Sequence, residues 1–198
     1  MKRLVLLILN AGTGTNLQAI IDAIENKSLK AKIAVVISSD KDAYGLKRAR
    51  KHNLKTEICP SKELLPKLKE YSPDFICLSG WRQFIEDNVL KAFPDRILNL
   101  HPGLIPDGLR GTVKNPDGTN ALWNRGKMTQ KAIQNFLDKK STYAGSSIHF
   151  LSNEFDFGKV LGRTFEKIRK NDNVESLYKR QKAKENKMYV EVLQSLCN

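Results

Sequence analysis

Two hydrophobic patterns alternate along the first hundred residues. Continuous apolar runs at 3–9, 32–38, 74–79 and 96–100 have the length and composition of strands buried on both faces. Segments with apolar residues at helical spacing lie between them, at 15–27, 42–53, 61–71 and 83–93, the third interrupted or restarted at Pro66. This alternation predicts an α/β fold with a mostly parallel central sheet and helices on both of its faces.

The second half follows a different pattern. Residues 103–127 are rich in Gly, Asn, Asp and Pro, and Asn-Pro-Asp-Gly at 115–118 predicts a turn. We expect a helix at 128–140, strands at 146–151 and 160–168, and a long helix over about 174–196. Because the chain contains no repeat, low-complexity segment or linker, we predict a single domain over residues 1–198.

The charge balance limits the choice of partner. The 198 residues carry a net charge of +13, which is spread along the chain and attracts anions in general. Only 8% of the residues are aromatic, and Lys and Arg form no stripe with aromatics between them, so the composition disfavours nucleic acid. A non-catalytic nucleic-acid-binding protein with a Rossmann-like core is the alternative from a different class.

The chain lacks the marks of a membrane, secreted or metal-binding protein. Its longest apolar run, at 4–9, is too short to cross a bilayer, and a secretory pattern is absent. Its three cysteines have no metal-ligand spacing, and their odd number suits a reducing compartment. We therefore expect a cytoplasmic monomer or homodimer that binds neither a membrane nor a metal.

Two polar side chains interrupt the apolar run that ends at Pro102. Asn99 and His101 stand two residues apart in a predicted strand, so both point to the same face. The carboxyl ends of parallel strands are where open α/β sheets bind ligands. An amide and an imidazole at this edge predict a functional site, although His101 could instead bond a loop backbone.

A strand, a glycine-bearing loop and a helix follow one another at 9–20. Glycines permit a tight turn, and a helix N-terminus offers N–H groups to an anion. Leu17 replaces the third glycine of a dinucleotide fingerprint, which disfavours an NAD-dependent oxidoreductase with Asp40 at the ribose, and a P-loop lysine is missing. A site for a single phosphate is the better prediction, with a plain strand–helix turn as the alternative. The loop residues concerned are Gly12, Thr13, Gly14, Thr15 and Asn16.

Further polar residues occur in apolar surroundings in the second half. His149 lies inside an apolar strand, and Asp156 lies between two phenylalanines, where a carboxyl either has a raised pKa, orients an imidazole or caps a turn. Gln181 and Glu185 fall on the apolar stripe of the last helix, where unpaired polar groups are costly, so they either meet the sheet edge or face a ligand cavity. The neighbouring Arg180 and Lys182 are expected to be solvated.

Four stretches together resemble the folate-dependent formyltransferases: "GTGTNLQAIIDA", "ISSDKDAYGLKRAR", "LNLHPGLIP" and "SSIHFLSNEFDFG". The resemblance covers nearly the whole chain except about 107–143. It implies a Rossmann-like formyltransferase fold with a phosphate-binding half at 1–100. A catalytic and folate-binding half would follow at 101–198, with an inserted segment at about 107–143.

The resemblance also implies a reaction. A formyl group would pass from the co-substrate 10-formyltetrahydrofolate to the primary amine of glycinamide ribonucleotide, in purine biosynthesis and without a metal. The partners would be small molecules. The alternative with the same chemistry is transfer to another amine, such as a nucleotide-linked amino sugar.

Residue roles are implied by position in the matching motifs. His101 would be the catalytic acid and base, Asn99 would bind the developing oxyanion, and Asp156 would orient the imidazole. The residues at 12–16 would hold the phosphate of the acceptor. The other contacts implied are Lys62 with the phosphate, Glu185 with the acceptor, and Arg82, Gln83, Ile85 and His149 with the folate.

Overall fold

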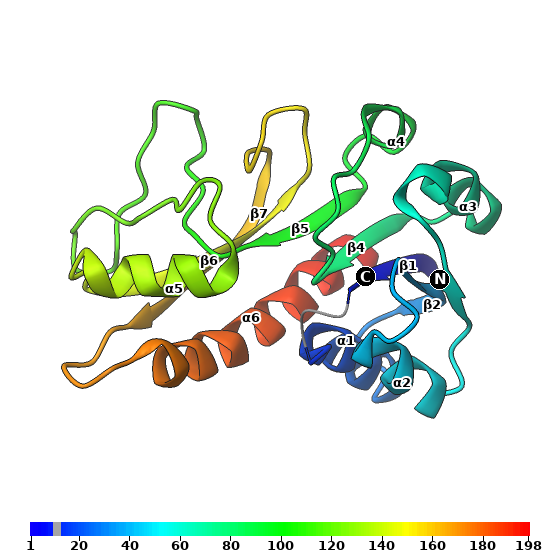
Figure 1. Ribbon diagram of the computed structural model, residues 1–198, viewed down its shortest axis with the longest axis horizontal. Helices are drawn as coiled ribbons and strands as arrows, with labels where there is room; N and C mark the ends of the chain where they lie inside the picture. The colour runs from blue at the N-terminus through cyan, green and yellow to red at the C-terminus, as the bar shows by residue number, and fades with distance from the viewer. Residues whose placement is uncertain (10–12) are drawn as a thin grey trace. The chain divides into compact units, whose positions relative to one another are not determined.

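The computed structural model describes residues 1–9 and 13–198, and these form two compact units. The first comprises Met1–Asn99 together with Leu193–Asn198, and the second comprises Leu100–Val192. The seven strands have the order β3-β2-β1-β4-β5-β6-β7 in a mixed, mostly parallel sheet, which confirms the predicted α/β class (Figure 1).

Parallel strands form the centre of the first unit. Its strands are β1 (Lys2–Ile8), β2 (Ala31–Ser38), β3 (Thr56–Ile58), β4 (Phe75–Ser79) and β5 (Ile97–His101), which continues into the second unit. In β1, residues 4–7 have no exposed surface at all. A strand buried on both faces has no polar side to alternate with, which explains why its sequence is a continuous apolar run.

Helices cover both faces of this part of the sheet, as Figure 1 shows, with α1 and α2 on one side and α3 and α4 on the other. Their bounds are α1 (Thr15–Glu25), α2 (Tyr44–Lys51), α3 (Leu64–Tyr71), which follows the 3₁₀ turn η1 (Ser61–Glu63), and α4 (Asp87–Ala92). Pro66 falls in the first turn of α3, where a missing N–H costs no helical hydrogen bond. It therefore marks the start of the helix.

An antiparallel pair and two helices make up the second unit. The elements are β6 (Tyr143–Phe150), β7 (Val160–Lys167), α5 (Thr129–Asp138) and α6 (Val174–Cys197), whose last residues belong to the first unit. The predicted turn at 115–118 is present, with the N–H of Gly118 donating to the carbonyl of Asn115 at 2.9 Å.

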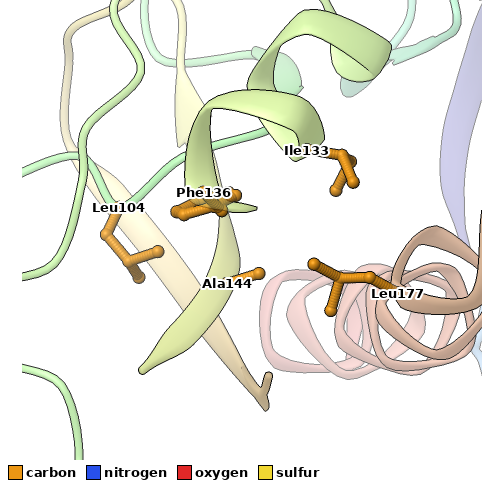
Figure 2. Packing of buried hydrophobic residues seen from close by; sticks show 5 residues of the cluster. All are labelled: Leu104, Ile133, Phe136, Ala144 and Leu177. Atoms are coloured by element: carbon orange, nitrogen blue, oxygen red, sulfur yellow. The ribbon is translucent and has the colours of Figure 1, made fainter. Parts of the chain in front are cut away.

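A hydrophobic cluster holds the second unit together. Figure 2 shows Ile133 and Phe136 of α5 near Ala144 of β6. Leu104, from the loop after β5, and Leu177 of α6 complete the cluster. Leu122 is one of the partly buried residues that pack against it. The segment at 107–143, where the family resemblance fails, thus packs through α5 and its flanks into a hydrophobic core shared with β6 and α6.

Two boundaries and one strand depart most from the sequence prediction. The helix expected at 83–93 begins only at Asp87, because Glu86 is extended, with φ −65° and ψ 150°. The strand expected at 146–151 begins at Tyr143. The short strand β3, at Thr56–Ile58, was not predicted, since three partly exposed residues carry too little pattern to stand out.

In the described part of the chain, none of the helices combines the length and the apolar character that crossing a bilayer requires.

Candidate active site

His101 and Asp156 meet at the carboxyl end of β5. His101 is the last residue of the strand, its side chain is 2% exposed, and its Nδ1 lies 3.5 Å from Oδ1 of Asp156. Its Nε2 lies 2.7 Å from the carbonyl oxygen of Trp123. A carbonyl only accepts, so Nε2 carries the hydrogen that is donated. The structure therefore pairs the two residues that the sequence proposed as partners.

Asp156 has a backbone conformation that few residues other than glycine adopt. Its φ is 49°, in the left-handed region, which Asp tolerates better than most side chains. Its Oδ2 accepts a hydrogen bond of 2.7 Å from the N–H of Gly126. Burial by itself raises the pKa of Asp156, but the bond and charge of His101 and the Gly126 N–H outweigh it and lower the pKa below the ordinary 3.8. The group is therefore a carboxylate at neutral pH.

Asn99 lies two residues before His101 on β5 and is partly exposed. Because side chains two apart in a strand project from the same face, its amide leaves the strand on the side of the imidazole. The pattern seen in the sequence at this strand end is thus retained in β5.

His149 is completely buried in β6. Its Nδ1–H donates to the carbonyl of Phe150 at 3.0 Å. Desolvation, followed by the charge of His101, lowers its pKa from the ordinary 6.5 to about 4. The ring is therefore neutral at pH 7. Its contact with folate stays a prediction.

The loop after His101 is tied to β6 by one hydroxyl. Ser147 Oγ donates to the carbonyl of Gly103 at 2.8 Å and accepts from the N–H of Ile105 at 2.9 Å. A Cβ on Gly103 would lie 1.7 Å from the carbonyl oxygen of Trp123, so only glycine fits there. The close approach of Trp123 to His101 thus depends on a residue without a side chain.

The predicted phosphate loop leads into the N-terminus of α1. Gly14 caps the helix with φ 68°, and the side chains of Thr15 and Asn16 follow it. Within the described residues, Thr15 Oγ1 and Asn16 Oδ1 are buried without a hydrogen-bond partner. Buried polar atoms of this kind call for a partner, which a bound ligand could supply. Gly12 lies outside the described residues.

The other predicted phosphate contacts are at the surface of the first unit. Thr13 is exposed, and its carbonyl accepts a hydrogen bond of 2.7 Å from Nε of Arg48. Lys62 is exposed in η1. The sequence did not indicate Arg48 as a residue that holds this loop.

Glu185 is buried at the contact of α6 with β6. Its Oε1 accepts 2.6 Å from Ser146 Oγ, and its Oε2 lies 3.1 Å from Nζ of Lys182. Gln181 Nε2 donates to Ser146 Oγ at 2.6 Å. Both side chains are thus hydrogen-bonded to β6, while Gln181 Oε1 is buried without a hydrogen-bond partner among the described residues. The contact of Glu185 with the acceptor stays a prediction.

Two residues of α6 expected to be solvated are instead partly buried and paired. Lys182 bonds Glu185, and Arg180 Nη2 lies 2.6 Å from Asp172 Oδ2 while its Nε lies 2.7 Å from Glu166 Oε1. The expectation was wrong because acidic side chains of β7, of the segment before α6 and of α6 itself lie within ion-pair distance of the two cations.

The segment predicted to line the folate pocket is a loop between β4 and α4. Arg82 and Gln83 are exposed, whereas Ile85 is 6% exposed. Ser61 Oγ donates to the carbonyl of Phe84 at 3.0 Å and anchors the loop. Among the described residues, no three His, Cys, Asp or Glu side chains gather in a way that could hold a metal ion.

Sequence reasoning missed the residues around the His101–Asp156 pair that come from 103–126. Trp123 accepts the bond from His101 with its carbonyl, and Gly103 makes room for that carbonyl. The only signal in the sequence is one large aromatic residue in a stretch rich in Gly, Asn and Pro.

Comparison with known proteins gives a consistent result. Residues 2–193 match the family described as formyl transferase. A phosphoribosylglycinamide formyltransferase of Dictyostelium discoideum is 34% identical, with 96% of each chain covered. The chloroplastic enzyme of that name from Arabidopsis thaliana is 28% identical, with 99% of this chain and 66% of the relative covered.

Solved structures agree with the sequence comparison. Glycinamide ribonucleotide transformylase 1 from Symbiobacterium toebii has a TM-score of 0.82 at 31% identity, covering 100% of this chain and 88% of that one. The phosphoribosylglycinamide formyltransferase of Coxiella burnetii, in complex with CHES, has a TM-score of 0.81 at 30% identity, covering 99% and 87%.

Proposed function

Because this chain belongs to the formyl transferase family, we propose that it transfers a formyl group from 10-formyltetrahydrofolate to the primary amine of glycinamide ribonucleotide. The single observation that carries the proposal is the buried imidazole of His101 beside the carboxylate of Asp156 at the end of β5. The full-length similarity to enzymes named phosphoribosylglycinamide formyltransferase supports the choice of acceptor.

The reaction needs one bond made, one bond broken and one proton moved. The acceptor amine attacks the formyl carbon and gives a tetrahedral intermediate with a negative oxygen. The Asn99 amide donates a hydrogen bond to that oxygen, which is worth most where charge develops. The carbon–nitrogen bond to the folate then breaks, and the proton lost by the amine reaches the folate nitrogen through His101.

Asp156 serves the imidazole in this scheme. Its carboxylate is ionised at neutral pH, because its pKa is lowered overall despite its burial. A fixed negative charge at 3.5 Å from Nδ1 stabilises the imidazolium that forms when His101 takes the proton. Asp156 therefore acts as a positioning and stabilising group.

The acceptor phosphate belongs at the N-terminus of α1 in this proposal. Free N–H groups and the helix dipole attract an anion there, and the buried hydroxyl of Thr15 can donate to it. Gly12, Thr13, Gly14 and Asn16 are assigned to the same phosphate, and Lys62 adds a positive charge. Glu185, anchored by Ser146, is assigned to the acceptor.

The folate is assigned to the loop between β4 and α4 and to His149. Arg82, Gln83 and Ile85 would contact it largely through backbone groups. A substitution that alters the backbone of this loop, such as Gln83→Pro, should therefore change the KM for the folate more than the KM for the acceptor.

The proposal is tested by following the absorbance change as 10-formyltetrahydrofolate loses its formyl group. Glycinamide ribonucleotide, a nucleotide-linked amino sugar and buffer without an amine are the three arms. We expect rapid turnover with the first only. Turnover with the amino sugar alone would reassign the acceptor, and equal formyl loss without any amine would identify a hydrolase. Absence of turnover in all three arms would overturn the proposal.

A further inference from the structure

One segment holds both members of the His101–Asp156 pair. The segment 121–126 lies within 107–143, where the sequence resemblance to the family fails, so the resemblance implies no role for it. Its Trp123 accepts the hydrogen bond from His101 Nε2 through the main-chain carbonyl at 2.7 Å. The indole Nε1–H of the same residue donates to the carbonyl of Asp156 at 3.0 Å.

The segment is itself anchored on both sides. Asn124 is 6% exposed, and its Nδ2 donates to the carbonyl of Pro102 at 3.1 Å while its Oδ1 accepts from Asn135 of α5 at 2.7 Å. Leu122 packs against the hydrophobic cluster of the second unit. The carbonyl of Trp123 is therefore fixed by packing and by bonds independent of the catalytic pair.

Residues of the same segment also donate hydrogen bonds to the turn that contains Asp156. The N–H of Gly126 donates to Asp156 Oδ2 at 2.7 Å, and Arg125 Nε donates to the carbonyl of Phe155 at 2.9 Å. The Arg125 guanidinium also lies 5.1 Å from the centre of the Trp123 ring. Four of the bonds around the pair thus come from six consecutive residues.

We propose that segment 121–126 positions the catalytic pair, with Trp123 as the positioning residue that fixes His101 in its Nε2–H form. Under this assignment Nδ1 is the nitrogen that gains and loses the proton during formyl transfer. The inference rests on the proposed function for its chemistry, but its geometry concerns the free protein.

The assignment follows from what each neighbour can accept. A carbonyl has no proton to give, so a bond at Nε2 requires the hydrogen on that nitrogen. Nδ1 then carries the lone pair in the neutral ring and faces a carboxylate oxygen at 3.5 Å. Two electron-rich atoms repel each other, and a proton on Nδ1 turns the repulsion into attraction. Asp156 therefore stabilises a proton at Nδ1 specifically.

The tautomer can be measured directly. The chain has three histidines, which makes imidazole ¹⁵N resonances simple to assign with His52→Gln and His149→Gln variants. In the neutral state we expect the Nε2–H form for His101. His149 provides an internal reference of the opposite kind, because its Nδ1–H donates to the Phe150 carbonyl.

Variants then test whether the Trp123 carbonyl is what fixes the His101 tautomer. Gly103→Ala places a methyl group on the Trp123 carbonyl, whereas Gly108→Ala meets no atom within 4 Å and serves as the matched control. We expect Gly103→Ala to lose the Nε2–H preference and about 10- to 100-fold in kcat, since misplacing a catalytic group by about 1 Å costs that much. The KM values should change less than threefold.

Trp123→Phe removes the bond to Asp156 but keeps an aromatic ring. We expect kcat to fall about tenfold and the acid limb of its pH profile to move, because Asp156 is no longer held beside Nδ1. Melting curves and circular dichroism check that each variant folds. If Gly103→Ala fails to fold, Trp123→Phe and the wild-type spectra decide the question.

The outcomes separate this inference from the proposed function. An active wild-type enzyme whose neutral His101 is in the Nδ1–H form would overturn the inference, and so would a Trp123→Phe variant with unchanged kcat and pH profile. A wild-type protein that transfers no formyl group but shows the Nε2–H form, lost in Gly103→Ala, would contradict the proposed function and support the positioning.

Discussion

The hydroxyl of Ser146 donates a hydrogen bond of 2.6 Å to Oε1 of Glu185, and both side chains are almost completely buried. A carboxylate removed from water is costly unless its oxygens are bonded. Here Lys182 bonds the second oxygen, at 3.1 Å, so the charge is compensated from two sides. Glu185 is thus fixed in one orientation before any acceptor binds.

Ser146→Ala removes the hydrogen bond to Glu185 and should affect both stability and the binding of the acceptor. Loss of the donor leaves a buried oxygen short of a bond, and we expect the free energy of unfolding to fall by about 1–3 kcal/mol. The KM for glycinamide ribonucleotide should rise severalfold with little change in kcat. Chemical denaturation and steady-state kinetics measure both. Ser28→Ala, which removes an exposed hydroxyl, is the control, and equal behaviour of the two variants would argue against the assignment of Glu185.

The catalytic pair gives the largest expected loss of activity. His101→Ala and Asp156→Asn should each lower kcat by at least about 100-fold, because proton transfer loses its group or its orientation. Formyl transfer is measured by absorbance, and the fold by thermal melting. Glu154→Gln, in the same loop and exposed, is the matched control and should keep its kcat, since exposed ion pairs contribute little. Near-normal turnover of either pair variant would remove His101 or Asp156 from the mechanism.

Gly14 supports the phosphate loop through its backbone. Its φ is 68°, and a Cβ there would lie 3.2 Å from Cα of Gly45. Gly14→Ala should cost about 1–2 kcal/mol of stability from the left-handed conformation alone. It should also raise the KM of the phosphorylated acceptor, which kinetics and calorimetric titration measure.

The control for Gly14→Ala isolates the backbone strain. Gly118 has φ 84°, in the turn at 115–118, and a Cβ added there would meet no atom within 4 Å. Gly118→Ala should show a similar loss of stability without a change in KM. If both variants leave the KM unchanged, the loop at 13–16 does not bind the acceptor.

Much of the fold could be predicted from the sequence, because parallel strands buried on both faces appear as continuous apolar runs. The run at 4–7 is apolar at every position since it is covered on both faces. The start of α4 was not readable, because Phe84 and Ile85 continue a helical spacing although Glu86 is extended. Periodicity reports which side chains are apolar and does not report backbone angles.

Some residues of the candidate site could likewise be predicted from the sequence, and others could not. His101 and Asp156 carry chemistry in their side chains, so residue type and local pattern indicated them. Trp123 acts on His101 through a main-chain carbonyl, which every residue possesses, and across 22 positions of sequence. Gly103 matters only because of the atom that approaches it. Such contacts depend on the packing of 107–143 and have no signature in the sequence.

His149 makes stability depend on pH in a definite direction. Its pKa is about 4 in the folded protein, against 6.5 ordinarily, because burial and the charge of His101 oppose protonation. The unfolded chain therefore binds this proton as the pH falls through 6.5, and the folded protein binds it only near pH 4. Between these values protonation favours the unfolded state, so stability falls with falling pH, by up to about 3 kcal/mol. Below pH 4 this group adds no further loss.

Denaturant unfolding at intervals from pH 7 to pH 4 measures the slope. His149→Gln removes the titrating group, so we expect a lower stability at pH 7, from the altered buried contact, but a flatter dependence on pH. His52→Gln is the control, because His52 lies at the surface of the first unit, where its Nδ1 is 2.7 Å from Glu25 and its side chain is partly exposed. Parallel slopes for the wild type and His149→Gln would show that protonation of His149 does not drive the acid destabilisation.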